Sequence, residues 1–438
     1  MTVSENRIFD LSMIWKQASA LFPYFDKLDM NWDQVYLKYL SKLSDSLSEM
    51  EFHLLLAEFT NQLCDGHTDY SLPRSLRSSH GFFPFSLRLV ENRYYIDTAP
   101  RAYEELLYQP ILAINHMPIE QLITQLFRYC YHVDTYIPGY RLHHFLPFLL
   151  NPAGNILSTE KGEYAFDLLP EIPRELQAAE ISLPRGFLLL KQNKLDIRLY
   201  DESILYVRID DFLYREAADE IRAALQNANG IKGLIVDVRE NIGGMTIYGA
   251  EVAKLLISGE FQACSKRTRL TKGVDFASAS QLSRWSEERI NKHITDGYST
   301  REEMEESLQY IKNAHFFHYQ DRFGSPNHTA LFNGPCVLLS SRHTLSAAED
   351  FTAMFKTNKR AVIIGAPTSG TTGTPLIQQL SCGGMLRVCS VGYRLLDGTE
   401  FIGRGIEPDI PCELTLDDYR KGYDSVLEKG LSHLKTLL

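Results

Sequence analysis

Ser346 stands where a serine hydroxyl can act on a carbonyl group. It follows the apolar run Pro335–Ser340, which predicts a buried strand, and it begins a predicted helix in Thr344-Leu-Ser-Ala-Ala-Glu349. The unpaired N–H groups and positive dipole end of a helix N-terminus can stabilise an oxyanion after such a serine attacks. Serine is also a favoured helix N-cap, so its position alone leaves a purely structural interpretation open.

A glycine turn provides a second element of the same chemistry. Asn241-Ile-Gly-Gly244 lies between the apolar run Gly233–Val238 and a helix predicted from about Met245 to Leu256. Glycine is common in tight turns of this kind, because it tolerates unusual φ/ψ values. The same turn can bring a backbone N–H close to a substrate carbonyl. Neither a Gly-x-Ser-x-Gly elbow nor a P-loop occurs in the chain.

A histidine near the N-terminus is the candidate base. His67 lies in Asp65-Gly-His-Thr68, just after the helical pattern of residues 48–63 ends. A histidine in a turn is commonly a surface or capping residue, but a serine nucleophile needs a base and imidazole titrates near neutral pH. His343 is a rival base, which we expect to face away from Ser346.

Four motifs occur in an order that is known from one family. They are Asp-Gly-His-Thr at 65–68, Leu-Ile-Val-Asp-Val-Arg-x-Asn-x-Gly-Gly at 234–244, Thr-x-Ser-Ala-Ala-Glu at 344–349 and Gly-x-Gly-Ile-x-Pro-Asp at 403–409. Together they resemble the tail-specific (C-terminal processing) serine peptidases and the related tricorn core peptidases. The resemblance runs along much of the chain and is strongest from about 204 to 435.

The resemblance implies a role for each matching residue. Ser346 matches the family's nucleophile. The N–H of Gly243, or in second place that of Gly244, and the N–H of Ala347 match the oxyanion hole.

One departure from the family bears on the base. Many members use a Ser–Lys pair, with the lysine in a Thr-x-Gly-Lys-Gly loop; here that loop reads Thr368-Ser-Gly-Thr-Thr-Gly373, and no lysine occurs from 360 to 420. The tricorn-like branch takes its histidine from the N-terminal part, and His67 matches that position. At the position that matches the orienting glutamate of that branch, this chain has Ile402. Glu400 is the candidate instead, since it shares a face with that position on an extended strand.

Two further expectations are structural. Glu349 supports the turn at the start of its helix, and Asp237 forms an ion pair with Arg239 beside the oxyanion turn.

The resemblance also implies an α/β (α+β) fold, with a crotonase-like ββα spiral protease core, an N-terminal helical region and a PDZ-like small α/β module. We assign the helical region with His67 to residues 1–75, the PDZ-like module and a connector to 76–200, and the serine peptidase core to 201–438. Within these, 151–195 reads as polar and irregular, and 264–330 as a charged helical excursion. Thr415 with Asp418 resembles a capping signal for one last helix.

Composition excludes several classes of protein. The 438 residues are 44% hydrophobic, which is ordinary for a globular protein, and they exceed what one compact core supports. The net charge of −10 offers no global basic field for nucleic acid or an anionic membrane. No apolar run is long enough for a transmembrane helix.

The seven cysteines and the N-terminus predict a cytoplasmic location. The cysteines are scattered and odd in number, and no Cys-x-x-Cys pair indicates a zinc or redox site. Residues 1–17 lack a basic segment followed by an apolar one, so they do not read as a secretory signal.

We therefore expect a serine endopeptidase or carboxyl-terminal processing peptidase that needs no metal or cofactor. Its partners are peptide or unfolded protein substrates, and the sequence does not decide whether it forms a homo-oligomer. Two alternatives stay open: an inactive, peptide-binding member of the family, and a dedicated peptidase or acyl-transfer enzyme of a peptide maturation pathway. A crotonase-type acyl-CoA enzyme ranks last, because it does not need the Ser-Ala-Ala-Glu helix start.

Overall fold

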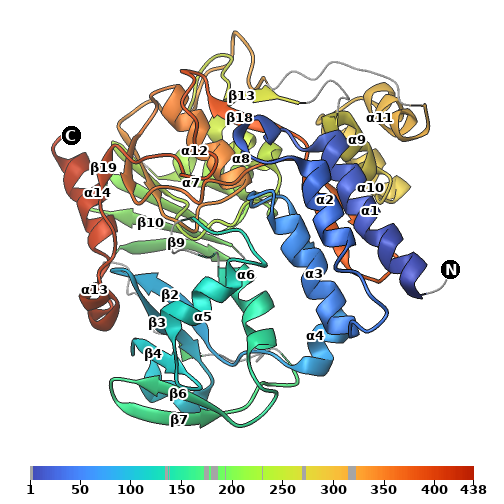
Figure 1. Cartoon of the computed structure of the whole chain (residues 1–438). Helices are drawn as coiled ribbons and strands as arrows, with labels where there is room; N and C mark the ends of the chain where they lie inside the picture. The colour runs from blue at the N-terminus through green and yellow to red at the C-terminus, as the bar shows by residue number, and fades with distance from the viewer. Residues whose placement is uncertain are drawn as a thin grey trace. The chain divides into compact units, whose positions relative to one another are not determined.

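The chain forms two compact units, and each unit is assembled from three separate segments. Figure 1 labels most of their helices and strands. The computed structural model describes residues 3–133, 137, 139–171, 177–178, 186–192, 194–228, 230–268, 273–313 and 322–438. Unit 1 consists of Met1–Ala179, Arg267–His318 and Gly373–Gly392. Unit 2 consists of Glu180–Lys266, Tyr319–Thr372 and Tyr393–Leu438.

Helices form the N-terminal part of unit 1, as predicted. They are α1 (Val3–Leu21), α2 (Trp32–Leu40), α3 (Glu49–Asn61) and α4 (Arg74–His80). Trp32 stacks on Phe59 with ring centroids 4.6 Å apart, and the buried Tyr39 contacts the same Phe59 ring. Ser48 and Glu51 form a capping box that begins α3. Many of the aromatic residues therefore pack a core between these helices.

A three-stranded antiparallel sheet joins distant parts of unit 1. Its order is β1 (Asp69–Ser71), β17 (Met385–Cys389), β16 (Pro375–Gln379), and Asp69 pairs with Arg387. The buried Asp10 of α1 accepts hydrogen bonds from the N–H groups of Ser381 and Cys382 in the β16–β17 turn, at 2.8 and 2.9 Å. This carboxylate ties the first helix to the hairpin.

The middle of unit 1 is a small mixed α/β module. One sheet holds β2 (Ser86–Val90), β3 (Arg93–Ala99) and β8 (Gln177–Ala178), and another holds β5 (Met117–Pro118), β4 (Ile111–Ile114), β6 (Asn155–Thr159) and β7 (Gly162–Phe166). Its helices are α5 (Ile119–Leu126) and α6 (Gly139–Phe145). The PDZ-like character of this module stays a prediction.

The expectation that residues 151–195 are irregular is wrong where the structure describes them. Strands β6 and β7 form an antiparallel hairpin there, and β9 (Phe187–Gln192) is a strand of unit 2. In β6 the buried positions are Asn155, Leu157 and Thr159. Two of the three are polar, so the period-2 pattern of apolar residues that marks a half-buried strand is missing from the sequence.

The predicted excursion at 264–330 is helical where it is described. It contains α9 (Gly273–Leu282), α10 (Glu287–Thr295) and α11 (Arg301–Asn313). Two further short strands, β13 (Cys264–Arg267) and β18 (Gly392–Leu395), pair with each other. None of the helices that the structure describes is both long and apolar enough to cross a membrane.

Unit 2 is built on a seven-stranded sheet. Its order is β19 (Ile410–Pro411), β15 (Val362–Gly365), β14 (Cys336–Ser340), β12 (Gly233–Asp237), β11 (Ile204–Ile209), β10 (Leu195–Tyr200), β9. Neighbouring strands are parallel in the part of the sheet made by β19, β15, β14, β12 and β11. Strand β10 is antiparallel to both of its neighbours, β11 and β9. Every residue of β12 and β14 is buried, which is the burial that their continuous apolar runs predict. The predicted mixed α/β fold is confirmed.

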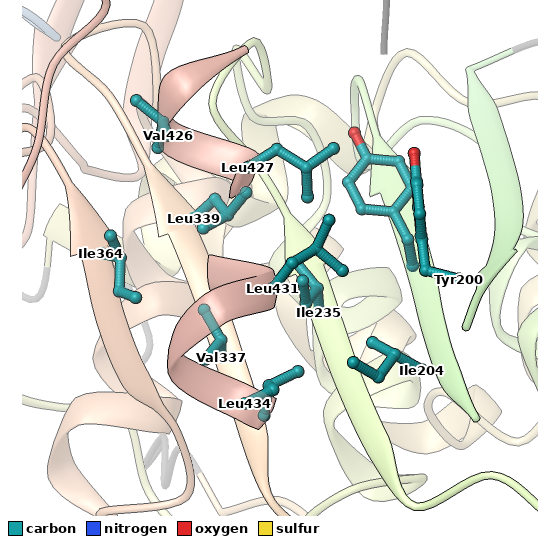
Figure 2. Packing of buried hydrophobic residues seen from close by; sticks show 11 residues of the cluster. Tyr200, Ile204, Ile235, Val337, Leu339, Ile364, Val426, Leu427, Leu431 and Leu434 are labelled. Carbon is teal, nitrogen blue, oxygen red and sulfur yellow. The ribbon is translucent and has the colours of Figure 1, made fainter. Parts of the chain in front are cut away.

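Helices cover both faces of this sheet. Leu427, Leu431 and Leu434 of α14 (Ser425–Lys435) pack onto one face, against Ile235, Val337 and Leu339 (Figure 2). Adjacent strand residues point to the opposite face, where α12 (Ala347–Thr357) packs against β14 and α8 (Thr246–Lys254) packs against α12. Helix α7 (Ala217–Asn227) packs against α8 and β11.

The C-terminal helical segment differs from the single last helix that was predicted. The capping box of Thr415 and Asp418 is present, but it begins only the short α13 (Leu416–Lys421). Gly422 then adopts a left-handed conformation, φ 61°, which ends α13. Asp424 caps the second helix, α14, by accepting from the N–H of Leu427 at 2.9 Å.

The predicted ion pair between Asp237 and Arg239 is confirmed and extends to a third residue. Arg239 donates to both carboxylate oxygens of Asp424, at 2.8 and 2.7 Å, and to Asp237 at 2.7 Å. Both aspartates are 2% exposed, so the guanidinium neutralises two carboxylates that have almost no water. This cluster joins the end of β12 to the start of α14.

We expect Asp424→Ala to destabilise the protein by about 3–5 kcal/mol, because it leaves Arg239 partly unpaired and removes the α14 cap. The control is Asp417→Ala, whose partner Lys421 is as exposed as Asp417 itself and which should cost less than about 1 kcal/mol. Urea unfolding followed by circular dichroism measures both. Equal effects of the two substitutions would contradict the assigned role of the Arg239 cluster.

Candidate active site

Ser346 has an unusual backbone conformation at the start of α12. Its φ is 58° and its ψ is −125°, and its side chain makes no capping hydrogen bond. Its N–H donates to the carbonyl of Thr371 at 2.9 Å, and its own carbonyl accepts from the N–H of Glu349 at 2.8 Å. A positive φ is costly for serine, so surrounding bonds must hold it. The structure does not support the interpretation of Ser346 as an ordinary side-chain N-cap.

The glycine turn lies directly against this serine. A Cβ on Gly243 would be 2.6 Å from the Cβ of Ser346 and 2.8 Å from the carbonyl oxygen of Leu345. Its φ of 94° also favours glycine. Only glycine therefore allows the turn after β12 to approach the turn before α12 this closely.

Asn241 holds the glycine turn in place, and sequence reasoning missed this role. Its side chain is fully buried, donates to the carbonyl of Ile209 at 3.1 Å and accepts from the N–H of Gly243 at 2.9 Å. The backbone carbonyl of Asn241 accepts from the backbone N–H of Leu345 at 3.0 Å. The available signal was an amide residue two positions before the first glycine, where an Asx-type hydrogen bond to the turn is common.

The predicted oxyanion donors lie in these two turns. The position that a Cβ of Gly243 would take is 3.0 Å from the nitrogen of Ala347. The Gly243 N–H is already bonded to Asn241, whereas the N–H groups of Gly244 and Ala347 have no acceptor in the described part of the chain. The geometry thus brings the two turns together, and the choice between Gly243 and Gly244 as donor stays a prediction.

Glu349 holds the loop where many relatives carry a lysine. Its buried carboxyl group accepts from the Thr368 hydroxyl at 2.5 Å and from the N–H groups of Gly370 and Thr371 at 2.8 and 2.6 Å. Because the carbonyl of Thr371 accepts the Ser346 N–H, Glu349 supports the serine backbone through this loop. We expected Glu349 to support the turn at the start of its own helix, and its carboxyl group bonds this loop.

Asp350 bonds two further segments of the same site. Its carboxylate accepts from the hydroxyls of Thr372 at 2.8 Å and Thr246 at 2.6 Å. Thr246 is the first residue of α8, two residues after Gly244 of the glycine turn. The start of α12 therefore bonds both the loop after β15 and the helix that follows the oxyanion turn.

His67 lies in a buried turn of unit 1. The backbone N–H of His67 donates to the Asp65 carboxylate at 3.2 Å, and a Cβ on Gly373 would lie 3.4 Å from the Cβ of His67. Burial, and then the positive charge of Arg387, lower the pKa of His67 to about 3. The imidazole is therefore neutral at pH 7, which is the form that accepts a proton.

Ionic contacts surround this histidine turn. Arg141 and Arg387 both donate to the carboxylate of Asp69, two residues after His67, and the two guanidinium groups hold the pKa of that carboxyl well below its usual range against the effect of burial. Burial raises the pKa of Asp65 to about 6. The ion pairs anchor β1 and therefore the turn that ends in it.

The other two sequence candidates differ from His67 in their surroundings. Glu400 is exposed, and the strand on which its alignment with Ile402 depended is absent: β18 ends at Leu395 and residues 399–402 are not a strand. The strand argument for Glu400 is therefore wrong, and its orienting role stays a prediction. His343 is half-buried, and its backbone N–H donates to the Ser341 hydroxyl at 3.0 Å.

The fold of the chain is that of known peptidases. It matches a solved structure of mature CPAF complexed with lactacystin, with a TM-score of 0.73 and 16% identity over 100% of this chain and 99% of the other. It also matches the photosystem II D1 C-terminal processing protease, with a TM-score of 0.51 and 14% identity over 94% of both chains.

Sequence comparison gives the family. Residues 203–412 match the model of peptidase family S41. A carboxy-terminal-processing protease of Bartonella bacilliformis is 35% identical over 101 residues, 23% of either chain. The chloroplastic carboxyl-terminal-processing peptidase 2 of Arabidopsis thaliana is 23% identical over 211 residues, 48% of this chain and 32% of the relative.

Residues 203–412 are therefore a peptidase family S41 domain. The resemblance to C-terminal processing peptidases is confirmed. The matched segments span less than half of these curated relatives' own length.

We expect Glu349→Gln to destabilise the protein by about 1–3 kcal/mol at pH 6, because an amide can accept from Gly370 or Thr371 but not from both. Burial raises the pKa of Glu349 from 4.5 to about 8. Between these pH values the folded protein keeps a proton that the unfolded chain has released, so wild-type stability falls as pH rises. The difference in the free energy of unfolding between the wild type and Glu349→Gln, measured by urea unfolding, should therefore shrink as pH rises from 4.5 to 8. A constant difference would contradict a raised pKa of Glu349.

The lowered pKa of His67 predicts the shape of a pH–rate profile. If His67 is the base, the acid limb of kcat/KM should lie well below pH 6.5, because the folded protein keeps the imidazole neutral down to about pH 3. Peptide cleavage between pH 4 and 8, with folding checked by circular dichroism at each pH, measures this. A limb centred near pH 6.5 would show that His67 titrates as an ordinary histidine.

Proposed function

We propose that this chain is a serine peptidase that hydrolyses peptide bonds of peptide or unfolded protein substrates, with Ser346 as nucleophile and His67 as base. One observation carries the proposal above the others. Ser346 is held at a positive φ where the N-terminus of α12 meets a turn that only glycine can form. A strained serine beside backbone N–H groups is the arrangement that acyl transfer requires.

The proposed reaction follows from the roles of these groups. His67 takes the hydroxyl proton of Ser346 while the oxygen attacks the peptide carbonyl. The N–H groups of Ala347 and of Gly243 or Gly244 stabilise the oxyanion. His67 then gives its proton to the leaving amine, which leaves an acyl-enzyme. Water, activated by the same imidazole, hydrolyses the ester and restores Ser346.

The missing family lysine supports the choice of His67 as the base, because the loop that would carry the lysine contains no side chain that can act as a base.

We also propose that the protein works in a reducing compartment such as the cytoplasm. All seven cysteines are free thiols, four of them buried. Free thiols persist where glutathione and thioredoxin keep them reduced.

Ser346→Ala and His67→Ala should each lower kcat by about 10⁴–10⁶-fold, and the double variant by little more, because the two groups act together. A fluorophosphonate probe should modify the wild type at Ser346 and should not modify Ser346→Ala. Ser283→Ala, at an exposed serine of unit 1, is the matched control and should keep full labelling.

Two results would contradict the proposal in different ways. Full peptidase activity of a folded Ser346→Ala variant would exclude the nucleophile. A wild-type protein that binds peptides but is neither labelled nor active would instead be a non-catalytic, peptide-binding member of the family.

A further inference from the structure

Two strongly exposed apolar side chains flank the glycine turn of the proposed active site. Ile242 is 62% exposed and Leu213 is 67% exposed, and among the large apolar side chains that the structure describes only Phe187 is more exposed. Single exposed apolar residues are normal on protein surfaces. Here two of the three most exposed ones lie beside the same turn.

The backbone fixes both residues at this turn. Phe212 and Gly244 form a parallel bridge, in which the Phe212 N–H donates to the Gly243 carbonyl at 2.8 Å and the Met245 N–H donates to the Phe212 carbonyl at 2.9 Å. Ile242 precedes Gly243, and Leu213 follows Phe212. The nitrogen of Leu213 is 3.0 Å from the place that a Cβ of Gly244 would take. One side chain therefore lies on each side of the two glycines.

Their neighbours show that the exposure is local. Asn241 and Phe212, the residues directly before Ile242 and Leu213, are 0% and 1% exposed. The Phe212 ring packs on Phe351 of α12 with centroids 5.1 Å apart. Each exposed apolar side chain thus follows directly after a buried residue in its own segment. Ile242 also has a backbone N–H and carbonyl without a partner in the described part of the chain.

We propose that Ile242 and Leu213 form an apolar subsite that selects substrates with a large apolar side chain within two residues of the scissile bond. This inference rests on the proposed peptidase function, because the scissile carbonyl must then lie at the glycine turn. Residues of an extended peptide are spaced by about 3.3 Å. We therefore expect the side chains within two residues of the scissile bond to lie close to Ile242 and Leu213. The unpaired backbone groups of Ile242 can hydrogen-bond such an extended chain.

The test compares two peptides in one assay. Internally quenched peptides carry either leucine or serine at the two positions on each side of one cleavable bond, and the ratio of their kcat/KM values is measured. The wild type should prefer the leucine peptide by about 10-fold or more. Ile242→Ser and Leu213→Ser should each reduce this ratio several-fold, and Ile242→Glu should shift preference towards peptides with lysine at one of these positions.

Leu437→Ser is the matched control. Leu437 is 53% exposed, and its neighbour Leu438 approaches Gly233, at the opposite end of β12 from the glycine turn. This variant should keep the wild-type ratio.

Fluorophosphonate labelling of Ser346 separates the two hypotheses. If labelling is normal but the ratio is close to one, or is unchanged in Ile242→Ser and Leu213→Ser, the subsite is overturned and the peptidase stands. If the wild type is neither labelled nor active, the proposed function fails and the subsite falls with it.

Discussion

The hydrogen bond from the Ser346 N–H to the Thr371 carbonyl is the contact on which the rest of the site depends. It holds a serine at a positive φ that the residue would not adopt by itself. The buried carboxyl group of Glu349 fixes the loop of Thr371, and Asn241 fixes the glycine turn on the other side. The backbone of the nucleophile is therefore positioned by polar groups inside the protein.

Much of the parallel sheet and of the nucleophile's surroundings could be predicted from sequence. Continuous apolar runs such as that of β12 are distinctive, because strands buried on both faces need no polar residues. The glycine turn and the helix start were visible for a similar reason: only a few residue types satisfy a left-handed turn or an N-terminus.

The parts that sequence reasoning missed depend on long-range contacts. The fully buried Asn155 of β6 accepts a hydrogen bond from the amide of Asn115, 40 residues away, and nothing local in the sequence indicates that partner. The proposed alignment of Glu400 assumed a strand, but Glu400 lies in an irregular segment and Ile402 in a turn. The role of Glu349 was also hidden, because its donors come from a loop about 20 residues further along the chain.

The pairing of β1 with β17 has a consequence for synthesis on the ribosome. The carboxylate of Asp69 meets Arg387 across 318 residues of sequence, and the third segment of unit 1 ends only at Gly392. The N-terminal helices can form early, but the sheet that anchors His67 must wait for almost the entire chain. A nascent or truncated protein cannot complete this sheet, so the turn that holds its histidine stays without its anchor until translation is nearly finished.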